Sequence, residues 1–199
     1  FYGSMVMPVA MARELSTRVG GLACGIGQSE TTMLVTRFSA DEHRVALREN
    51  EALVASCGKP AMLAAVKIFD DAMQEVAIGE VGEMCVRGPL VMQGYWAQPD
   101  LSARGFLRRT GNGGLEEIYY RTGDLVQELA GGDLKYLGRK DRQVKTRGYR
   151  VELDEVETAL LSHAQVQEAA VYTVPDGEGS HLIVAAVTPE LGYQPAVAE

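Results

Sequence analysis

The stretch Gly25-Ile26-Gly27-Gln28-Ser29-Glu30-Thr31-Thr32 combines residue types that suit phosphate chemistry. Two glycines let the backbone approach a flat or charged ligand, and the three hydroxyls can bond phosphate oxygens. The carboxylate of Glu30 could hold Mg²⁺, which prefers one or two carboxylates together with phosphate oxygens. The alternative is an ordinary polar turn after a strand, and this stretch alone does not decide between the two.

A second group of polar residues lies in two segments, Tyr120-Arg121-Thr122-Gly123-Asp124-Leu125 and residues 138–152. Six of the twelve residues at 139–150 are Lys or Arg, which predicts a local anion site. We expect a nucleotide site on one side of this group and a moving lid on the other.

The overall composition excludes several classes of function. The chain has 199 residues, of which 46% are hydrophobic and 23% charged, as is typical of a globular protein with a buried core. Its formal charge of −8 argues against binding to nucleic acid or to an anionic membrane, because a phosphate-covered surface attracts a basic face. No apolar run approaches the ~20 residues of a membrane span. We therefore expect no nucleic-acid partner and no membrane.

The cysteines Cys24, Cys57 and Cys85 are odd in number and lack a zinc-type spacing. We expect each to be a small buried side chain in a reduced, cytoplasmic protein. The N-terminus, Phe1-Tyr2-Gly3, has neither an initiator Met nor the basic start of a signal peptide. The chain is therefore expected to begin inside a larger protein.

The first part of the chain is predicted to alternate helix and strand. Apolar residues recur at helical spacing from Val9 to Val19, and Gly20-Gly21 ends that helix. Residues 22–26 are predicted to form a short buried strand that runs into the glycine- and hydroxyl-rich stretch. Residues 40–56 are polar and charged, which is typical of a loop or a short helix.

The middle of the chain is predicted to be a β-subdomain. Strand-like residues 62–69 and 83–87 flank turn residues, as in a hairpin. A second hairpin is predicted over residues 119–137, with its turn at Gly131-Gly132-Asp133. Trp96, the only tryptophan, is expected to anchor packing rather than to contact a ligand.

The C-terminal part is predicted to be a small helix-plus-sheet unit. Residues 152–162 have a helical apolar face with acidic residues in the first turn, where the helix dipole favours them. Strands are predicted at residues 166–174 and 182–187, and residues 189–199 are predicted to be a tail or linker.

Three motifs occur in a fixed order: Gly82-Glu83-Met84-Cys85-Val86-Arg87-Gly88-Pro89 with Gly94-Tyr95, then Tyr120-Arg121-Thr122-Gly123-Asp124, then Gly138 to Lys145 with Gly148-Tyr149-Arg150-Val151-Glu152. Together they resemble the adenylate-forming superfamily, whose members are acyl-CoA synthetases, nonribosomal-peptide adenylation domains and firefly luciferase. The resemblance covers the chain from Gly3 to about Val187.

The resemblance implies a fold class of α/β plus α+β. The chain would be the C-terminal part of the large adenylation domain, with a strand–helix–strand portion and a β-subdomain, followed by a small, mobile, truncated α+β domain. The implied boundaries are residues 1–138 for the large ATP-binding domain, 139–141 for a hinge and 142–199 for the incomplete small domain. Asp141 would be the pivot of the hinge.

The resemblance also implies roles for residues at matching positions. Asp124 would bind both ribose hydroxyls, since one carboxylate can accept two O–H bonds, and Arg139 would reach ribose or phosphate. Ser29 and Glu30 match the family's Thr-Glu pair, which implies a hydroxyl on the α-phosphate and a catalytic carboxylate on Mg²⁺. The other implied nucleotide contacts are Gly3, Ser4, Met5, Ile26, Gly27 and Tyr136.

Two further residues are implied in transfer of the acyl group. Lys145 would be catalytic on the face presented for thioester formation, and Gly148 would leave room for a phosphopantetheine arm. Without the resemblance, the simpler interpretations are that Asp124 caps a turn, that Arg139 pairs with Asp141, and that Lys145 is a solvated charge on a strand.

The sequence departs from the family pattern in two ways. Ile26 stands where the family often has an aromatic residue that stacks on adenine, so an apolar contact would replace the stack. The phosphate-gripping Ser/Thr/Gly-rich loop and the catalytic lysine, which would lie beyond Glu199, are both outside this sequence. The fragment alone is therefore not expected to adenylate a substrate.

The preferred function is a part of an ATP- and Mg²⁺-dependent ligase. It would activate a small carboxylic or amino acid as acyl-AMP and pass it to the thiol of CoA or of a phosphopantetheinyl acyl- or peptidyl-carrier protein. The alternatives are a truncated or degenerate adenylation-like binding or scaffold module, and part of an interrupted adenylation domain in a multidomain synthetase. Residues 27–30 and 57–60 favour acyl-CoA synthetases and residues 142–145 favour peptide synthetases, so the acceptor thiol and the acid stay open.

Overall fold

The structure, a computed structural model, describes residues 1–3, 7–32, 34–111, 113–146, 149–176, 181–190 and 192. The predictions for Ser4, Met5 and Gly148, and for the side chain of Lys145, lie outside this description. The chain divides into two compact units, Phe1–Lys140 and Asp141–Glu199. This division falls inside the segment 139–141, for which a hinge was inferred; the hinge itself stays a prediction.

The first unit begins with short helices. The residues at 40–56 form helix rather than an irregular loop, and Ser39 begins it with a reciprocal cap: its hydroxyl accepts from the backbone of Glu42, whose carboxylate accepts from the backbone of Ser39. The predicted N-terminal helix is confirmed. The elements are α1 Val9–Arg18, η1 Ser29–Thr31, α2 Ala40–Glu49 and η2 Glu51–Ala55.

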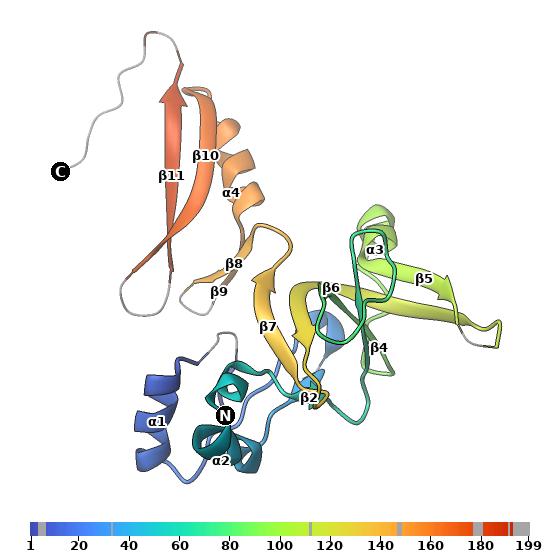
Figure 1. The fold of residues 1–199 in the computed structure, drawn as a ribbon. Helices are drawn as coiled ribbons and strands as arrows, with labels where there is room; N and C mark the ends of the chain where they lie inside the picture. Colours follow the sequence, from blue (N-terminus) through green and yellow to red (C-terminus); the bar gives the residue numbers. More distant parts are fainter. Residues whose placement is uncertain are drawn as a thin grey trace. The chain divides into compact units, whose positions relative to one another are not determined.

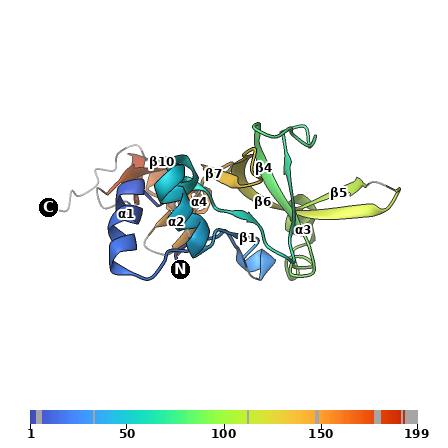
Figure 2. The ribbon, with the colours of Figure 1, turned by 60° about the horizontal axis from the view of Figure 1, so that its bottom comes forward.

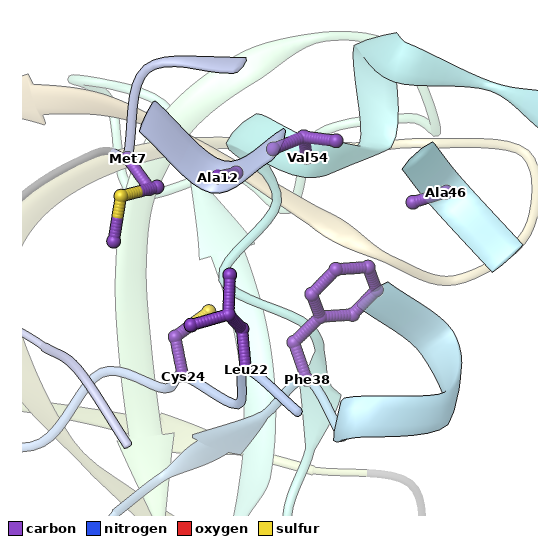
Figure 3. Close-up of a cluster of buried hydrophobic side chains, with 7 residues drawn as sticks. All are labelled: Met7, Ala12, Leu22, Cys24, Phe38, Ala46 and Val54. Carbon is purple, nitrogen blue, oxygen red and sulfur yellow. The ribbon is translucent and has the colours of Figure 1, made fainter. Parts of the chain in front are cut away.

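A small apolar core holds these helices together (Figure 3). Figure 3 shows Ala12 of α1, Ala46 of α2 and Val54 of η2 on one side, with Phe38 and Cys24 facing them. Ala12 and Ala46 are fully buried in this core, and Phe38 is its largest buried side chain, so Phe38 fills most of the space. The buried members are Met7, Ala12, Leu22, Cys24, Phe38, Ala46 and Val54.

Residues 22–26 do not form the predicted strand. Cys24 makes single bridges, parallel to Tyr2 and antiparallel to Phe38, and these do not continue into a ladder. The reason is local, because the N–H of Ile26 donates to the side-chain Oγ1 of Thr36 at 2.9 Å where a ladder would use a backbone carbonyl. The strand that contains Thr36, β1 Thr36–Arg37, pairs instead with β2 Lys59–Pro60.

The largest element of the first unit is a five-stranded antiparallel sheet (Figures 1 and 2). Its path is β3-β4-β6-β5, and β7 also pairs with β6. Both predicted hairpins are present, although the first strand begins at Ala65 rather than at residue 62. The strands are β3 Ala65–Phe69, β4 Val81–Arg87, β5 Phe106–Thr110, β6 Glu116–Glu128 and β7 Leu134–Arg139.

The long strand β6 has one partner along one edge and two along the other. β4 pairs with residues 120–127, whereas β5 pairs with 116–120 and β7 with 124–128 on the opposite edge. Figures 1 and 2 both show β5 and the first half of β6 running together as a ribbon. Among the strands that the structure describes, none therefore pairs with residues 121–123 on the edge opposite β4.

Trp96 is 96% exposed, so the prediction that it anchors packing is wrong. It lies in the loop before α3 Pro99–Gly105. The inward position is taken by its neighbour Tyr95, which is half-buried and whose hydroxyl bonds Glu30. Trp96 and Ala97 form the tip of a turn that the N–H of Gln98 closes on the carbonyl of Tyr95 at 3.2 Å, and the Trp96 side chain is left in solvent there.

The second unit has the predicted helix-plus-sheet composition. Its predicted helix and both predicted strands are confirmed, and β10 and β11 pair antiparallel along their length. Arg142, at the start of the unit, pairs with two acidic residues of α4. Its guanidinium lies 2.6 Å from Asp154 Oδ1 and 3.0 Å from Glu157 Oε2. The elements are β8 Gln143–Thr146, β9 Tyr149–Glu152, α4 Leu153–Leu161, β10 Val166–Pro175 and β11 His181–Pro189.

All three cysteines are free and buried, as expected. Burial raises the pKa of Cys57 and that of Cys85 to about 12, so both thiols stay protonated near neutral pH. Within the described residues, no helix is both long and apolar enough to cross a membrane.

His43 should make the first unit less stable in mild acid. Its ring is 1% exposed, Nε2 lies 2.9 Å from the Tyr2 hydroxyl, and Nδ1 has no hydrogen-bond partner among the described residues. Burial lowers the pKa of His43 below 6.5, against the opposing effect of the Glu42 charge. The unfolded chain therefore takes up this proton more readily, and stability present above about pH 6.5 is lost as the pH falls.

We expect urea denaturation to give a lower free energy of unfolding at about pH 5 than at about pH 7.5. His43→Gln, which cannot titrate, should flatten this part of the profile. A variant with the same pH slope as the natural protein would show that His43 is not the group responsible.

Candidate functional site

The segment Thr122-Gly123-Asp124 is a bulge in β6. On β4 one residue, Met84, separates Glu83 from Cys85, whereas their partners on β6, Leu125 and Arg121, are separated by three. Thr122 Oγ1 donates to the carbonyl of Met84 at 2.7 Å and accepts from the backbone N–H of Asp124 at 3.1 Å. Gly123 has φ +72°, a conformation that favours glycine. The bulge re-aims Asp124 relative to a regular strand.

Asp124 is 4% exposed, and each of its carboxylate oxygens accepts from a different side chain. Gln28 Nε2 donates to Oδ2 at 2.8 Å, and Arg139 Nη1 donates to Oδ1 at 3.1 Å. The same Arg139 nitrogen donates to the carbonyl of Thr122 at 2.7 Å. Arg139 is the strand partner of Asp124 across β6 and β7, which explains why the two side chains meet. The structure thus shows an ion pair of Arg139 with Asp124.

Gln28 joins the glycine- and hydroxyl-rich stretch to the β6 bulge. Its amide donates to the carbonyl of Thr122 at 3.0 Å as well as to Asp124, and its Oε1 accepts from the Tyr120 hydroxyl at 3.1 Å. Together with Arg139, Gln28 thus supplies donors to the Thr122 carbonyl at the part of the β6 edge that no described strand covers. The two segments that sequence reasoning singled out separately are thus parts of one site.

The segment after Gln28 is a single 3-10 turn. Thr31 and Gln28 bond one another at its start, and the carbonyl of Glu30 accepts from the backbone of Met92 at 2.8 Å. Glu30 is 5% exposed, and its Oε1 accepts from the Tyr95 hydroxyl at 3.1 Å. Ser29 is exposed beside it. The turn therefore holds Glu30 inward and leaves the Ser29 hydroxyl on the surface.

The other predicted nucleotide contacts lie in two places. Gly3 is exposed and lies beside the stretch, where a Cβ added to it would be 3.5 Å from the carbonyl of Gly25. Ile26 and Tyr136 both pack against the second apolar core, formed mainly by β3, β4 and β6, and both are only half-buried. Gly27, also half-buried, bridges to Leu34.

The described residues contain no group of three or more His, Cys, Asp or Glu side chains that could hold a metal ion alone. Glu30 by itself fits a different kind of Mg²⁺ site, in which one carboxylate acts together with phosphate oxygens and water. Asp141, the predicted pivot, accepts from the backbone N–H of Gln143 at 3.2 Å through Oδ1.

A cavity of about 120 Å³ lies elsewhere in the first unit, between β3 and the hairpin turn of β6 and β7. None of its lining residues belongs to the site described above. Its lining includes the Lys67–Glu75 ion pair and Glu128 beside apolar residues, and it adds nothing to the chemistry of Asp124.

Sequence reasoning missed Gln28, Tyr95 and Tyr120 as parts of the site. Gln28 lies inside the stretch that was singled out, but its role depends on partners 92 and 96 residues away. Tyr95 lies in a recognised motif and could have been suspected for that reason. No feature of the sequence alone pairs it with Glu30.

Two family models match the chain. The model for "AMP-binding enzyme" matches residues 1–96, and the model for "AMP-binding enzyme C-terminal domain" matches residues 155–199. The chain belongs to the AMP-binding enzyme family. It comprises the C-terminal portion of an adenylation domain followed by the family's C-terminal domain.

Named synthetases are similar to this family member in sequence. It is 46% identical over 132 residues to malpinin synthetase of Mortierella alpina. The aligned residues make up 66% of this chain and 2% of that synthetase. The chain is 38% identical over 172 residues to tyrocidine synthase 2 of Brevibacillus parabrevis. The aligned residues make up 86% of this chain and 5% of that synthase. The chain thus spans a small share of the curated relatives it matches.

Solved adenylation enzymes have the same fold. The amide bond synthetase McbA from Marinactinospora thermotolerans matches with a TM-score of 0.80 and 28% identity, over 98% of this chain and 37% of that one. PA1221, an NRPS protein containing adenylation and PCP domains, matches with a TM-score of 0.79 and 26% identity, over 97% and 38%. The expected fold class is thereby borne out as a mixed α/β fragment of an adenylation enzyme.

Proposed function

We propose that the chain takes part in ATP-dependent activation of an amino acid or another small carboxylic acid, and in its transfer to a phosphopantetheine thiol on a carrier protein. The observation that carries this proposal is the meeting of Gln28, Asp124 and Arg139 directly beside the turn that holds Glu30. Two buried carboxylates, a guanidinium, the exposed Gly3 and the half-buried Gly27 suit a nucleotide. The carboxylates suit its ribose and its metal-bound phosphates.

Asp124 would bind both ribose hydroxyls. A carboxylate offers about four lone-pair sites on two oxygens, which suits a group that presents two O–H donors side by side. Gln28 and Arg139 also fix the carboxylate plane before the nucleotide arrives, which lowers the entropy cost of binding. Arg139 would add positive charge near ribose or phosphate, and Ile26, Gly27 and Gly3 would lie against the base.

The first half-reaction requires little acid–base chemistry from the chain. The acid's carboxylate attacks the α-phosphorus of ATP, the bond to pyrophosphate breaks, and acyl-AMP forms. Ser29 would donate to the α-phosphate, and Glu30 would hold Mg²⁺, which when bound supplies charge neutralisation at the phosphate oxygens. Positioning and electrostatic stabilisation therefore account for the chain's contribution.

The second half-reaction would follow a rotation about Asp141. The thiol sulfur attacks the acyl carbonyl, AMP leaves with the bonding electrons, and the thiol proton passes to solvent. Lys145 and Gly148 would then belong to the face of the second unit that receives the thiol. A carrier protein is favoured over CoA by the similarity to large synthetases and to PA1221 with its PCP domain. The three free cysteines support a reducing, cytoplasmic setting.

The test is acid-dependent exchange of labelled pyrophosphate into ATP by the natural full-length protein, with a panel of amino acids. Exchange with at least one amino acid is expected. Binding of ATP without exchange for any acid would favour the alternative of a binding module without turnover.

Glu30→Gln should lower the exchange rate about a hundredfold, as expected for loss of a charge that stabilises a transition state. Glutamine keeps an oxygen that can accept from the Tyr95 hydroxyl, so the turn is retained while the charge is lost. The measurement is the exchange rate as a function of Mg²⁺ concentration, with Glu49→Gln at an exposed position of α2 as control. An unchanged Mg²⁺ dependence in Glu30→Gln would contradict the metal role.

A further inference from the structure

Glu83 is a buried carboxylate whose role the reaction scheme does not explain. It lies on β4 with its side chain 3% exposed, opposite Leu125 of β6. A buried charge is costly unless it is paired and hydrogen-bonded, so its partners indicate what it holds in place.

Glu83 binds the backbone of the bulge directly. Its Oε1 accepts from the N–H of Gly123 at 3.3 Å, where the bulge has displaced that group from the regular ladder. Its Oε2 accepts from Arg121 Nη2 at 2.7 Å, on the residue before Thr122. The carboxylate therefore contacts the bulge itself and the residue that precedes it.

The same carboxylate reaches the end of the first unit. Lys140 Nζ lies 3.3 Å from Glu83 Oε2 and 2.7 Å from Asp71 Oδ1. The hydrogen bond with Asp71, together with that with Glu83, raises the pKa of Lys140, so the ammonium stays charged. The backbone N–H of Lys140 donates to the carbonyl of Gly123 at 2.8 Å.

Both backbone groups of Gly123 are consequently held by this cluster, the N–H by Glu83 and the carbonyl by Lys140. Gly123 immediately precedes Asp124, and Lys140 immediately follows Arg139. Each of the two residues assigned to the ribose thus has a neighbour in the chain that the Glu83 cluster fixes.

We propose that Glu83 is a positioning residue that sets the orientation of Asp124 and Arg139 for the nucleotide, without touching the nucleotide itself. The inference rests on the proposed function. It predicts that Glu83 affects the affinity for ATP and AMP and leaves the affinity for the acid substrate unchanged.

Glu83→Gln tests this with little change in shape. Glutamine keeps one oxygen acceptor but loses the charge that attracts Arg121 and Lys140, and both cations are about one-third exposed, so they can turn to water. The apparent KM for ATP in pyrophosphate exchange should rise about tenfold, the size expected from loss of a hydrogen bond to a charged group. The KM for the acid should stay within about twofold.

Glu75→Gln is the matched control. Glu75 also contacts two cations on this sheet, Lys67 at 2.6 Å and Arg109 at 3.6 Å, but touches neither the bulge nor Lys140. This variant should leave both KM values unchanged. Glu83→Asp keeps the charge on a shorter side chain, so it should recover part of the ATP affinity and serves as the second variant if Glu83→Gln does not fold.

The possible results separate the two proposals. Equal changes in the KM for ATP and for the acid, or a lower stability with unchanged KM values, would overturn the positioning role. Asp124→Asn reports on the ribose site independently. If it binds ATP as the natural protein does, then the ribose is held elsewhere and Glu83 has no ribose site to position. No exchange by the natural protein with any acid would instead count against the proposed function.

Discussion

Asp124→Asn should reduce ATP-dependent pyrophosphate exchange by at least about a hundredfold. Asparagine has nearly the same shape, but it replaces one acceptor oxygen by an NH₂ donor that cannot accept a ribose O–H. It also removes the negative charge that Arg139 faces at 3.1 Å and that Gln28 contacts at 2.8 Å. Truncating one partner of a buried, hydrogen-bonded charge pair typically costs 2–5 kcal/mol, which is about thirtyfold to several thousandfold in affinity.

The measurement is the KM for ATP and the Kd for AMP, both in the natural full-length protein. Asp133→Asn is a suitable control because Asp133 is also buried, at 7% exposure, and lies in the turn of the same hairpin. It should leave nucleotide affinity unchanged. Normal AMP binding by Asp124→Asn would show that the ribose is held elsewhere.

Gly58→Ala should destabilise the first unit more than Gly79→Ala does. Gly58 has φ +85°, and a Cβ at this position would lie 2.0 Å from the carbonyl oxygen of Arg37 and 2.4 Å from the nitrogen of Phe38. Both are backbone atoms that cannot rotate away. The carbonyl of Gly58 also accepts from the N–H of Leu134 at 2.8 Å, which ties this turn to β7. A shift of the turn would therefore disturb the sheet.

Gly79→Ala isolates the part of this effect that comes from backbone conformation. Gly79 has φ +90° but has nothing within 4 Å of an added Cβ. Gly79→Ala should lower the free energy of unfolding by about 1–2 kcal/mol, because alanine disfavours the left-handed conformation. Gly58→Ala should lower it by at least about 2 kcal/mol more because of the clash. Denaturant midpoints and the rate of limited proteolysis would measure both. Equal losses in the two variants would mean that the Arg37–Phe38 backbone can move aside.

The predictions that succeeded depended on local pattern or on residues adjacent in the chain. Helical spacing located α1 and α4, and turn residues located both hairpins, because these features depend on neighbours within a few residues. The role of Asp124 rests instead on the resemblance of three motifs taken together, and it stays a prediction.

The failures depended on tertiary partners. Residues 22–26 have the composition of a strand, but the side chain of Thr36 takes the bond that a ladder would use. Trp96 has the large apolar side chain of a typical packing residue, but it is exposed, and its neighbour Tyr95 takes the inward position. The Gln28–Asp124 contact spans 96 residues, so no spacing rule could have predicted it from one sequence.

Lys140 and Arg142, the residues on either side of Asp141, are each held by acidic side chains of their own unit. Lys140 pairs with Asp71 and Glu83 in the first unit, and Arg142 pairs with Asp154 and Glu157 in the second. If Asp141 is the pivot, then changes in its two backbone torsions leave all of these ion pairs intact. Because the proposed rotation would break none of these ion pairs, we expect its direction to depend on the bound ligands rather than on ionic strength.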